Sequence, residues 1–291
     1  MCSVVRETAI AAPIYSRAGC GPRTDPEDGP LVAGASEPLY LQRNQPPGVP
    51  PLALTGERTL PDVPAENYWF QRHLVVYRWI AKRIAGRRVV DLACGEGYGA
   101  DELASSAASV VGVDANPEAH EHAKLRYRRA NLRFERGLIE TWEGEAQDIV
   151  FLQTIEHVED PDAVLERLAH QLAPGGALYL STPNVLTLAP RGAERSGNPW
   201  HVREYRPEVF AALCGRHFAH VELKGLFHAR KLRAHELALR AGWDAVHRRL
   251  GLTGAFYGWF TPAIATGDFR LRDARGAPMG RALDLLAICR A

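Results

Sequence analysis

The stretch at residues 88–100, Arg-Val-Val-Asp-Leu-Ala-Cys-Gly-Glu-Gly-Tyr-Gly-Ala, most constrains how this chain can fold. A short β-branched run leads into Asp91, a turn with glycines at 95, 97 and 99 follows, and a helical pattern begins after them. Glycine adopts backbone angles that other residues resist, and it lets a ligand approach the backbone closely. The stretch therefore predicts a strand, a glycine loop and a helix that together form the ligand-binding unit of an α/β sheet.

A second acidic residue supports this prediction by its distance from the loop. Asp114 stands 19 positions after Gly95 and closes the apolar run 110–113, which is typical of the next strand. An acid about 20 residues beyond a glycine loop is placed to accept hydrogen bonds from ribose hydroxyls. The pair indicates a cofactor that contains a nucleoside.

Two classes of cofactor use this geometry. The spacing Gly95-x-Gly97-x-x-Ala100 satisfies the relaxed dinucleotide fingerprint. Asp91, four residues before Gly95, favours the other class, because a carboxylate repels a pyrophosphate and attracts the ammonium group of an amino-acid-like cofactor. Here the chain resembles the class I S-adenosylmethionine (SAM) methyltransferases, whose first motif has the form Asp-x-x-x-Gly-x-Gly.

The residues before this unit divide into two segments. Residues 1–55 are rich in proline and glycine without a sustained period, so we expect them to be disordered, since they cannot bury enough apolar area to offset their ordering entropy. Residues 56–87 contain a helical pattern with Trp69, His73 and Val76 on one face. We expect this helix to form an N-terminal lid over the cofactor, although its aromatic residues are equally consistent with core packing.

Residues 88–291 alternate between strand and helix patterns and form the predicted catalytic domain. Polar residues follow the fourth and fifth predicted strands, at the edge where open α/β sheets bind ligands. The Ile-Glu-His-Val sequence at 155–158, Ser-Thr-Pro-Asn at 181–184 and Asn-Pro-Trp-His at 198–201 resemble the ubiquinone-biosynthesis-like branch of small-molecule O-methyltransferases. The resemblance implies a Rossmann-like α/β fold with a seven-stranded, mostly parallel sheet, an antiparallel last strand and helices on both faces.

The chain departs from that branch at two places. Gln153 stands where the quinone methyltransferases can carry a glutamate of a proposed magnesium site, so a hard cation loses one carboxylate; magnesium is possible but not favoured, and we predict no metal ligands. An acid that holds adenine in many relatives is replaced by the Gly-Leu-Ile-Glu sequence at 137–140, so we expect backbone groups and apolar contact at Leu138 and Ile139. The predicted cofactor-binding residues are Asp91, Ala93, Gly95, Glu96, Gly97, Asp114, Ala115, Leu138, Ile139 and Gln153.

The predicted catalytic residues are His157, Glu156 and His201. Methyl transfer to an oxygen requires alignment of the acceptor and removal of its proton, and an unperturbed imidazole has a pKa close to neutral pH. His157 is the first candidate for the base and His201 the second. The alternative is that His157 is a structural histidine fixed by Glu156.

Composition limits the partners and the compartment. The net charge of +1 predicts no broad basic surface for nucleic acid, and no apolar run is long enough to span a membrane. Five scattered cysteines without a C-x-x-C pair indicate reduced thiols and a cytoplasmic protein. We expect a small-molecule acceptor and a monomer or homodimer.

The segment at about 228–279 is longer than a minimal member of the family needs, and we expect this basic insertion to cover the substrate.

The sequence therefore predicts a SAM-dependent enzyme that methylates a hydroxyl on a small molecule such as a natural product, a sugar or a quinone-like compound. Four alternatives remain open: methylation of a nitrogen, methylation of a polysaccharide or protein, a non-catalytic methyltransferase-like binding protein, and an NAD-dependent oxidoreductase. Asp91 argues against the last of these.

Overall fold

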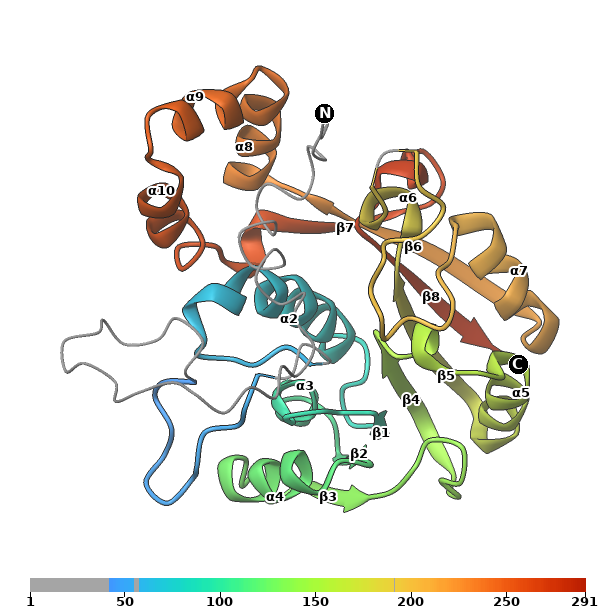
Figure 1. The fold of residues 1–291 in the computed structure, drawn as a ribbon. Helices are drawn as coiled ribbons and strands as arrows, with labels where there is room; N and C mark the ends of the chain where they lie inside the picture. The colour runs from blue at the N-terminus through green and yellow to red at the C-terminus, as the bar shows by residue number, and fades with distance from the viewer. Residues whose placement is uncertain (1–41, 55–57, 191) are drawn as a thin grey trace, which may run out of the picture.

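A single mixed sheet organises the fold of the computed structural model, which describes residues 42–54, 58–190 and 192–291 (Figure 1). Its eight strands lie in the order β3-β2-β1-β4-β5-β8-β6-β7. The strands are β1 (Arg88–Leu92), β2 (Ser109–Asp114), β3 (Leu132–Arg136), β4 (Ala146–Leu152), β5 (Leu172–Pro183), β6 (His220–His228), β7 (Phe269–Asp273) and β8 (Asp284–Arg290).

The first five strands pair in parallel, while β8 runs antiparallel between β5 and β6. The Rossmann-like fold class and the antiparallel last strand are thus confirmed. The expected number of seven strands is wrong by one. The additional strand β7 comes from within 228–279, where it pairs with β6 at the edge of the sheet.

Helices cover both faces of the sheet, as predicted. The helical elements are η1 (Pro64–Glu66), α2 (Asn67–Ala81), α3 (Tyr98–Ala104), α4 (Pro117–Arg126), η2 (Ile155–His157), α5 (Pro161–Gln171), α6 (Val185–Leu188), α7 (Pro207–His217), α8 (Arg230–Arg240), α9 (Trp243–Arg249), α10 (Thr253–Phe260), η3 (Thr266–Asp268) and η4 (Met279–Arg281). One apolar core joins α2 and α3 to the sheet, and a second joins α5 and α7 to the opposite face (Figure 1). No helix of the described residues is long and apolar enough to cross a membrane.

The segment 42–54 packs on the catalytic domain, and we call it the strap. Val49 and the side chain of Gln42 are buried, and the carbonyl oxygen of Pro50 lies 2.9 Å from His122 Nδ1 on α4. The expectation of a disordered segment over 1–55 therefore does not hold for these residues, because polar groups of the strap find buried partners despite its proline content. Residues 1–41 and 55 of that expectation lie outside the described part of the chain.

The insertion between β6 and β7 contains the helices α8, α9 and α10. Phe256 stacks between the rings of His235 and His247, with interplanar angles of 16° and 14°. The insertion contacts the start of α2, where Asn67 Nδ2 donates to the carbonyl oxygens of Thr261 and Ile264. It therefore forms a small helical layer of its own beside α2, and its role as a cover for substrate stays a prediction.

Candidate active site

A cavity of about 290 Å³ opens at the carboxyl ends of β1, β2, β4 and β5 and is closed on one side by α2. Residues from these strands, the loops after them and α2 form its wall. They are Arg58, Thr59, His73, Val76, Tyr77, Ala93, Cys94, Gly95, Glu96, Tyr98, Asp114, Ala115, Asn116, Leu152, Gln153, Thr154, His157, Ser181 and Asp284. Six predicted cofactor-binding residues are among them: Ala93, Gly95, Glu96, Asp114, Ala115 and Gln153.

Asp114 joins the glycine loop to the end of β2. Its Oδ2 accepts a hydrogen bond from the backbone N–H of Gly95 at 2.8 Å, and its Oδ1 accepts one from that of Asn116 at 2.9 Å. A carboxylate has about four lone-pair positions, so both oxygens can still accept another donor. The half-buried carboxylate thus fixes the loop and remains available to ribose hydroxyls at the cavity wall.

Asp91 lies beneath this wall and is fully buried. Its Oδ1 accepts a 3.3 Å hydrogen bond from the Tyr77 hydroxyl, while its Oδ2 has no partner among the described residues. Burial raises the pKa of Asp91 well above its usual range, and the nearby Asp114 adds to this, although the Tyr77 hydroxyl opposes it. A buried carboxylate with a free oxygen is stabilised by a cation, as the ammonium group of an amino-acid moiety would provide.

Gly97 serves the loop by packing and does not line the cavity. Its φ is 97°, and a Cβ there would lie 2.9 Å from the Cβ of Ala123 and 3.0 Å from the ring of Phe134. Two non-glycine residues at the wall, Ala93 and Gln153, also have positive φ values of 55° and 52°. Such backbone angles are costly and cluster at ligand-binding sites, which supports this cavity as the functional one.

The carboxylate of Glu96 is engaged elsewhere, so its expected role in holding the cofactor finds no support in its side chain. Its Oε1 lies 3.2 Å from Gln42 Nε2 of the strap and 3.0 Å from His122 Nε2, and its Oε2 accepts from the Tyr127 hydroxyl at 2.7 Å. Arg126 approaches the same carboxylate at 3.3 Å. Glu96 is therefore the buried centre of a network that holds the strap against α4.

Leu138 and Ile139 do not line the cavity, contrary to the expected adenine contacts. The side chain of Leu138 is 55% exposed, and Ile139 packs against the apolar core on the α5 face. Arg167 of α5 donates to the carbonyl oxygen of Ile139, which draws the chain after β3 towards that helix. Ile139 thus packs on the α5 face of the sheet, and Leu138 is exposed.

One face of helix α2 lines the cavity, and the spacing of its residues in the sequence already indicated such a face. His73, Val76 and Tyr77 stand at i, i+3 and i+4, and all three line the cavity. Burial lowers the pKa of His73 to about 4, so this imidazole is neutral near pH 7. Tyr98 on α3 completes this side, with its hydroxyl 3.5 Å from His73 Nδ1.

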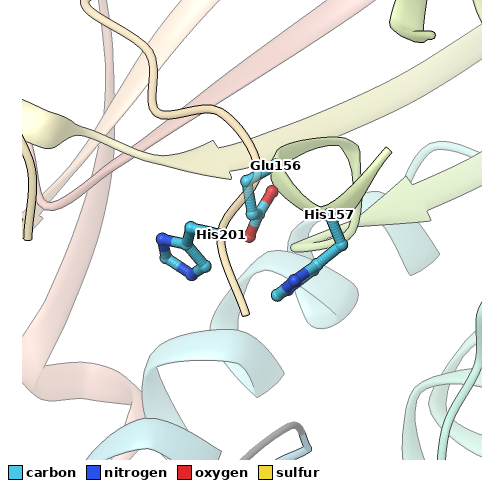
Figure 2. A group of neighbouring side chains, drawn as sticks. All are labelled: Glu156, His157 and His201. Atoms are coloured by element: carbon cyan, nitrogen blue, oxygen red, sulfur yellow. The ribbon is translucent and has the colours of Figure 1, made fainter. Parts of the chain in front are cut away.

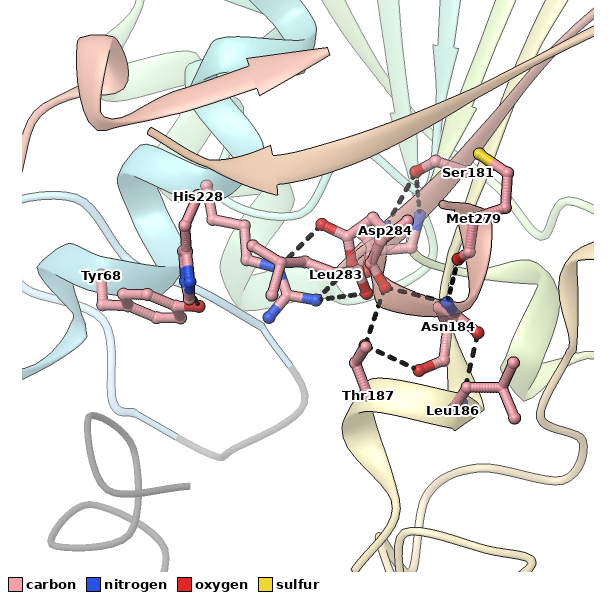
Figure 3. Close-up of polar contacts among 12 residues, drawn as sticks. Tyr68, Ser181, Asn184, Leu186, Thr187, His228, Met279, Leu283 and Asp284 are labelled. Atoms are coloured by element: carbon pink, nitrogen blue, oxygen red, sulfur yellow. Dashed lines mark hydrogen bonds and ion pairs between the residues drawn. The ribbon is translucent and has the colours of Figure 1, made fainter. Parts of the chain in front are cut away.

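Asp284 at the start of β8 forms the floor beside α2 (Figure 3). Arg72 on α2 donates to both of its oxygens, at 2.8 and 2.5 Å, and to the carbonyl oxygen of Leu283. The sequence analysis did not identify Asp284. A single acid at the start of a final strand that is otherwise largely apolar is a pattern that could have indicated it. Asn184, which we expected at the rim, is fully buried and donates to the carbonyl oxygens of Met279 and Ala282 (Figure 3).

The three predicted catalytic residues come together at one end of the cavity. Figure 2 shows the Glu156 carboxylate between the rings of His157 and His201, whose centroids are 5.1 Å apart. His201 arrives from a loop that is fixed to η2, because the backbone N–H groups of Val202 and Arg203 donate to the carbonyl oxygen of Glu156 at 2.9 and 3.0 Å. Only His157 of the three lines the cavity itself.

Both imidazoles of this cluster are oriented by their Nδ1 atoms. His157 Nδ1 lies 2.8 Å from the carbonyl oxygen of Trp200, which can only accept, so Nδ1 carries a proton, and in the neutral imidazole Nε2 then carries the lone pair. His201 Nδ1 lies 2.8 Å from Oε1 of Glu204. Burial lowers the pKa of His201 below its usual value, although the Glu204 carboxylate opposes this.

Glu156 is 2% exposed, and its Oε2 has no hydrogen-bond partner in the described part of the chain. Burial raises its pKa to about 8. Burial of this unpartnered oxygen beside the two histidines therefore costs free energy unless a further group binds Glu156.

The donor set does not fit the magnesium ion that the resemblance implies. Magnesium prefers oxygen ligands in octahedral geometry. The amide of Gln153 is engaged with Ser181, its Nε2 donating to the hydroxyl at 3.0 Å, and the remaining donors are one carboxylate and two imidazoles.

Comparisons with known proteins agree on one family. A family model described as a methyltransferase domain matches residues 68–237. A probable S-adenosylmethionine-dependent methyltransferase of Mycolicibacterium smegmatis is 36% identical over 245 residues, which cover 81% of this chain and 94% of that protein. A ubiquinone biosynthesis O-methyltransferase of Xylella fastidiosa is 33% identical over 128 residues, covering 40% of this chain and 52% of that protein.

One solved structure supports the fold alone. A SAM-dependent methyltransferase of Thermotoga maritima, described as a possible histamine N-methyltransferase, superimposes with a TM-score of 0.52 at 15% identity. The superposition covers 77% of this chain and 92% of that protein.

Proposed function

Because the chain belongs to the SAM-dependent methyltransferases, we propose that it methylates a hydroxyl group of a small molecule, with the acceptor proton taken at His157. The family assignment sets aside an NAD-dependent oxidoreductase and a non-catalytic binding protein. The observation that carries the proposal is the orientation of His157, a wall residue whose Nδ1 is bonded to the Trp200 carbonyl oxygen.

In this proposal the acids of the cavity hold the cofactor by two different groups. Asp91 binds the ammonium group of its amino-acid part through the unpartnered Oδ2, and Asp114 accepts hydrogen bonds from its ribose hydroxyls. When bound, SAM supplies a methyl group already activated by a sulfonium sulfur. The protein then has only to exclude water, align the acceptor and remove its proton.

His157 is suited to remove that proton by its geometry. In the neutral imidazole, the bond to the Trp200 carbonyl oxygen places the proton on Nδ1, so Nε2 can accept a proton from a hydroxyl within hydrogen-bond reach. Positioned bases contribute about 10²–10⁴-fold to such reactions. The partial similarity to a ubiquinone biosynthesis O-methyltransferase supports an oxygen acceptor.

The test combines isotopically labelled SAM with panels of hydroxylated and amine-bearing acceptors, and the product is located by mass spectrometry. We expect a methyl ether as the product and a rate about 10²–10⁴-fold lower for His157→Ala. The matched control is His170→Ala, which removes an exposed histidine on α5. Efficient methylation of an amine by both the wild type and His157→Ala would contradict the proposal, because a neutral amine needs no oxygen-directed base.

A further inference from the structure

We propose that Asp284, Ser181 and His73 bind further hydroxyl groups of the acceptor, which makes the substrate a polyhydroxylated ring of the sugar or cyclitol class. This inference rests on the proposed O-methylation and names the acceptor for it. All three residues line the same cavity as His157. They are therefore available to the molecule whose hydroxyl His157 would deprotonate.

The order of the strands places two of these groups on the acceptor side of the cavity. The glycine loop follows β1, and β4, β5 and β8 then succeed one another away from it. His157 follows β4, Ser181 lies near the end of β5, and Asp284 opens β8. An acceptor hydroxyl at His157 therefore has Ser181 and Asp284 on the side that is farther from the glycine loop.

The register of β5 and β8 turns both side chains to the same face of the sheet. Ser181 lies opposite Leu286 in this antiparallel pair. Two residues further along β5, Pro183 lies opposite Asp284. Opposite residues share a face, as do alternate residues of one strand, so Ser181 and Asp284 are diagonal neighbours on one face. Leu286 belongs to the apolar core on the α2 side, so this is the face that α2 covers with His73.

The carboxylate of Asp284 is held in a fixed orientation and can accept further hydrogen bonds. Arg72 donates to both of its oxygens, at 2.8 and 2.5 Å (Figure 3). A carboxylate has about four lone-pair positions, so two remain for other donors. The side chain is 3% exposed, so contact with an apolar ring would desolvate these positions without a partner, whereas hydroxyl groups would satisfy them.

Ser181 and His73 add a hydroxyl donor and an uncharged imidazole. The Ser181 hydroxyl oxygen accepts from the backbone N–H and the Nε2 of Gln153, at 3.2 and 3.0 Å, so its own O–H remains to be donated. His73 is neutral near pH 7, because burial lowers its pKa to about 4. The Tyr98 hydroxyl lies 3.5 Å from its Nδ1 and leaves Nε2 for a ligand.

These groups together exceed what an acceptor with one or two hydroxyls can satisfy. A phenol offers a single hydroxyl, which the base engages, and a catechol offers one more. A sugar or cyclitol carries several hydroxyls that both donate and accept, so it can engage all three groups while one hydroxyl stays at His157. A site whose polar groups require hydroxyl partners rejects ligands that lack them, because those groups are then left unpaired.

The first test measures kcat/KM of the wild type with labelled SAM for acceptors that differ in their number of hydroxyls. One group contains myo-inositol, glucose and methyl glucoside, and the other contains cyclohexanol, phenol and catechol. We expect the best polyol to exceed the best member of the second group by about 100-fold or more.

A second group that matches the polyols, or the absence of any methylated polyol, would overturn the inference. Methylation of catechol that depends on His157 would still support the proposed O-methylation, so the two proposals fail in different ways.

The second test changes the individual contacts and verifies folding by thermal melting. Asp284→Asn should raise the KM for the polyol about 10-fold or more, as for a lost hydrogen bond to a charged group, with SAM affinity unchanged in calorimetry. Ser181→Ala should raise this KM about 3–10-fold. This variant keeps the pair of Arg72 and Asp284, so it tests the site even if Asp284→Asn does not fold.

The matched control is Asp273→Asn, an exposed acid at the end of β7, which should leave the KM unchanged. A polyol KM that neither site variant raises, or a loss of SAM affinity in Asp284→Asn as large as the rise in KM, would contradict the inference.

Discussion

At the scale of single residues, the site depends on two acids with different environments. Asp114 is half-buried and already accepts two backbone N–H groups, whereas Asp91 is fully buried with one oxygen unpartnered. The first can serve hydroxyl donors next to solvent, and the second requires a charged donor. This difference is a physical reason for the two acids to hold different parts of one cofactor.

Asp114→Ala is expected to weaken SAM binding by about 1.5–3 kcal/mol, the scale of hydrogen bonds to a charged group. The variant also removes the acceptor for the Gly95 N–H, so the loss should not fall below this range. Calorimetric titration measures the change. The control is Asp101→Ala, an acid on α3 that pairs with Arg129 on the surface, and equal weakening in both variants would remove the assignment.

Glu66, at the start of α2, should make stability depend on pH. It is 8% exposed, and burial raises its pKa to about 7 in the folded protein from an ordinary value of 4.5. The folded state therefore holds this proton more tightly than the unfolded state, and its stabilising contribution is complete below about pH 4.5 and is lost as pH rises to about 7. The loss is on the order of 3 kcal/mol.

Replacing this side chain by a neutral amide tests the sign. Glu66→Gln should be more stable than the wild type at pH 8.5, and the difference should shrink towards pH 4.5, as measured by urea denaturation. The control is Glu118→Gln, an exposed acid on α4. A variant that is less stable than the wild type at pH 8.5 would show that the Glu66 carboxylate is charged and paired.

The residues that the sequence could identify are those whose motif is local. Gly95, Asp114 and Asp91 follow from spacing around the glycine loop, and the structure places Gly95 and Asp114 at the cavity wall with Asp91 buried beneath it. Tyr77 and Asp284 come from α2 and β8, which tertiary packing alone brings to the cavity. Leu138, an expected adenine contact, is exposed and does not line the cavity, because a sequence motif does not show on which side of the sheet edge a loop turns.

At the scale of elements, the strap is held by side chains that a compositional argument overlooks. Gln42 donates to Glu96 at 3.2 Å, and its Oε1 accepts from the backbone N–H of Leu52 at 3.0 Å. Gln42→Ala should therefore lower the free energy of unfolding by about 1–3 kcal/mol, because buried partners lose their bonds. Gln45→Ala, at a less buried position of the strap, should cost less. Equal small effects in chemical denaturation would mean that the strap adds little stability.

Helix α2 is joined to β8 by the buried ion pair of Arg72 and Asp284, whose side chains are 5% and 3% exposed. Removing one partner leaves an uncompensated buried charge, so Arg72→Met should cost about 3–5 kcal/mol. The double variant Arg72→Met with Asp284→Leu should recover much of this loss in urea denaturation. A double variant as unstable as the single one would show that shape, not charge, dominates at this contact.

Strands buried on both faces were predictable because their central residues form continuous apolar runs, as at 149–152 in β4 and 177–180 in β5. The strap and β7 were not. The strap has the composition of a disordered segment and gains its order from buried hydrogen bonds to α4 and Glu96. Strand β7 is an edge strand with exposed, charged residues, so its pattern does not differ from that of a solvated insertion.

At the scale of the whole molecule, the cavity lies where the strand order reverses. The sheet runs β3-β2-β1 in one direction and β4-β5 in the other, so the loops after β1 and β4 diverge and leave a crevice between them. The glycine loop follows β1, and Gln153 and the Glu156–His157 pair follow β4. The predicted cofactor-binding and catalytic residues therefore lie at the same crevice because of the strand order. The alternating pattern of strands and helices in the sequence predicts this topology.

We propose that this crevice recognises the amino-acid end of SAM through Asp91 and its nucleoside end through Asp114. The most direct measurement is a calorimetric titration of wild type and Asp91→Asn with SAM and with 5′-methylthioadenosine, which lacks the ammonium and carboxylate groups. We predict that Asp91→Asn weakens SAM about 10–100-fold, the equivalent of a hydrogen bond to a charged group, and leaves 5′-methylthioadenosine unchanged. Equal weakening of both ligands, or unchanged SAM affinity, would contradict the account.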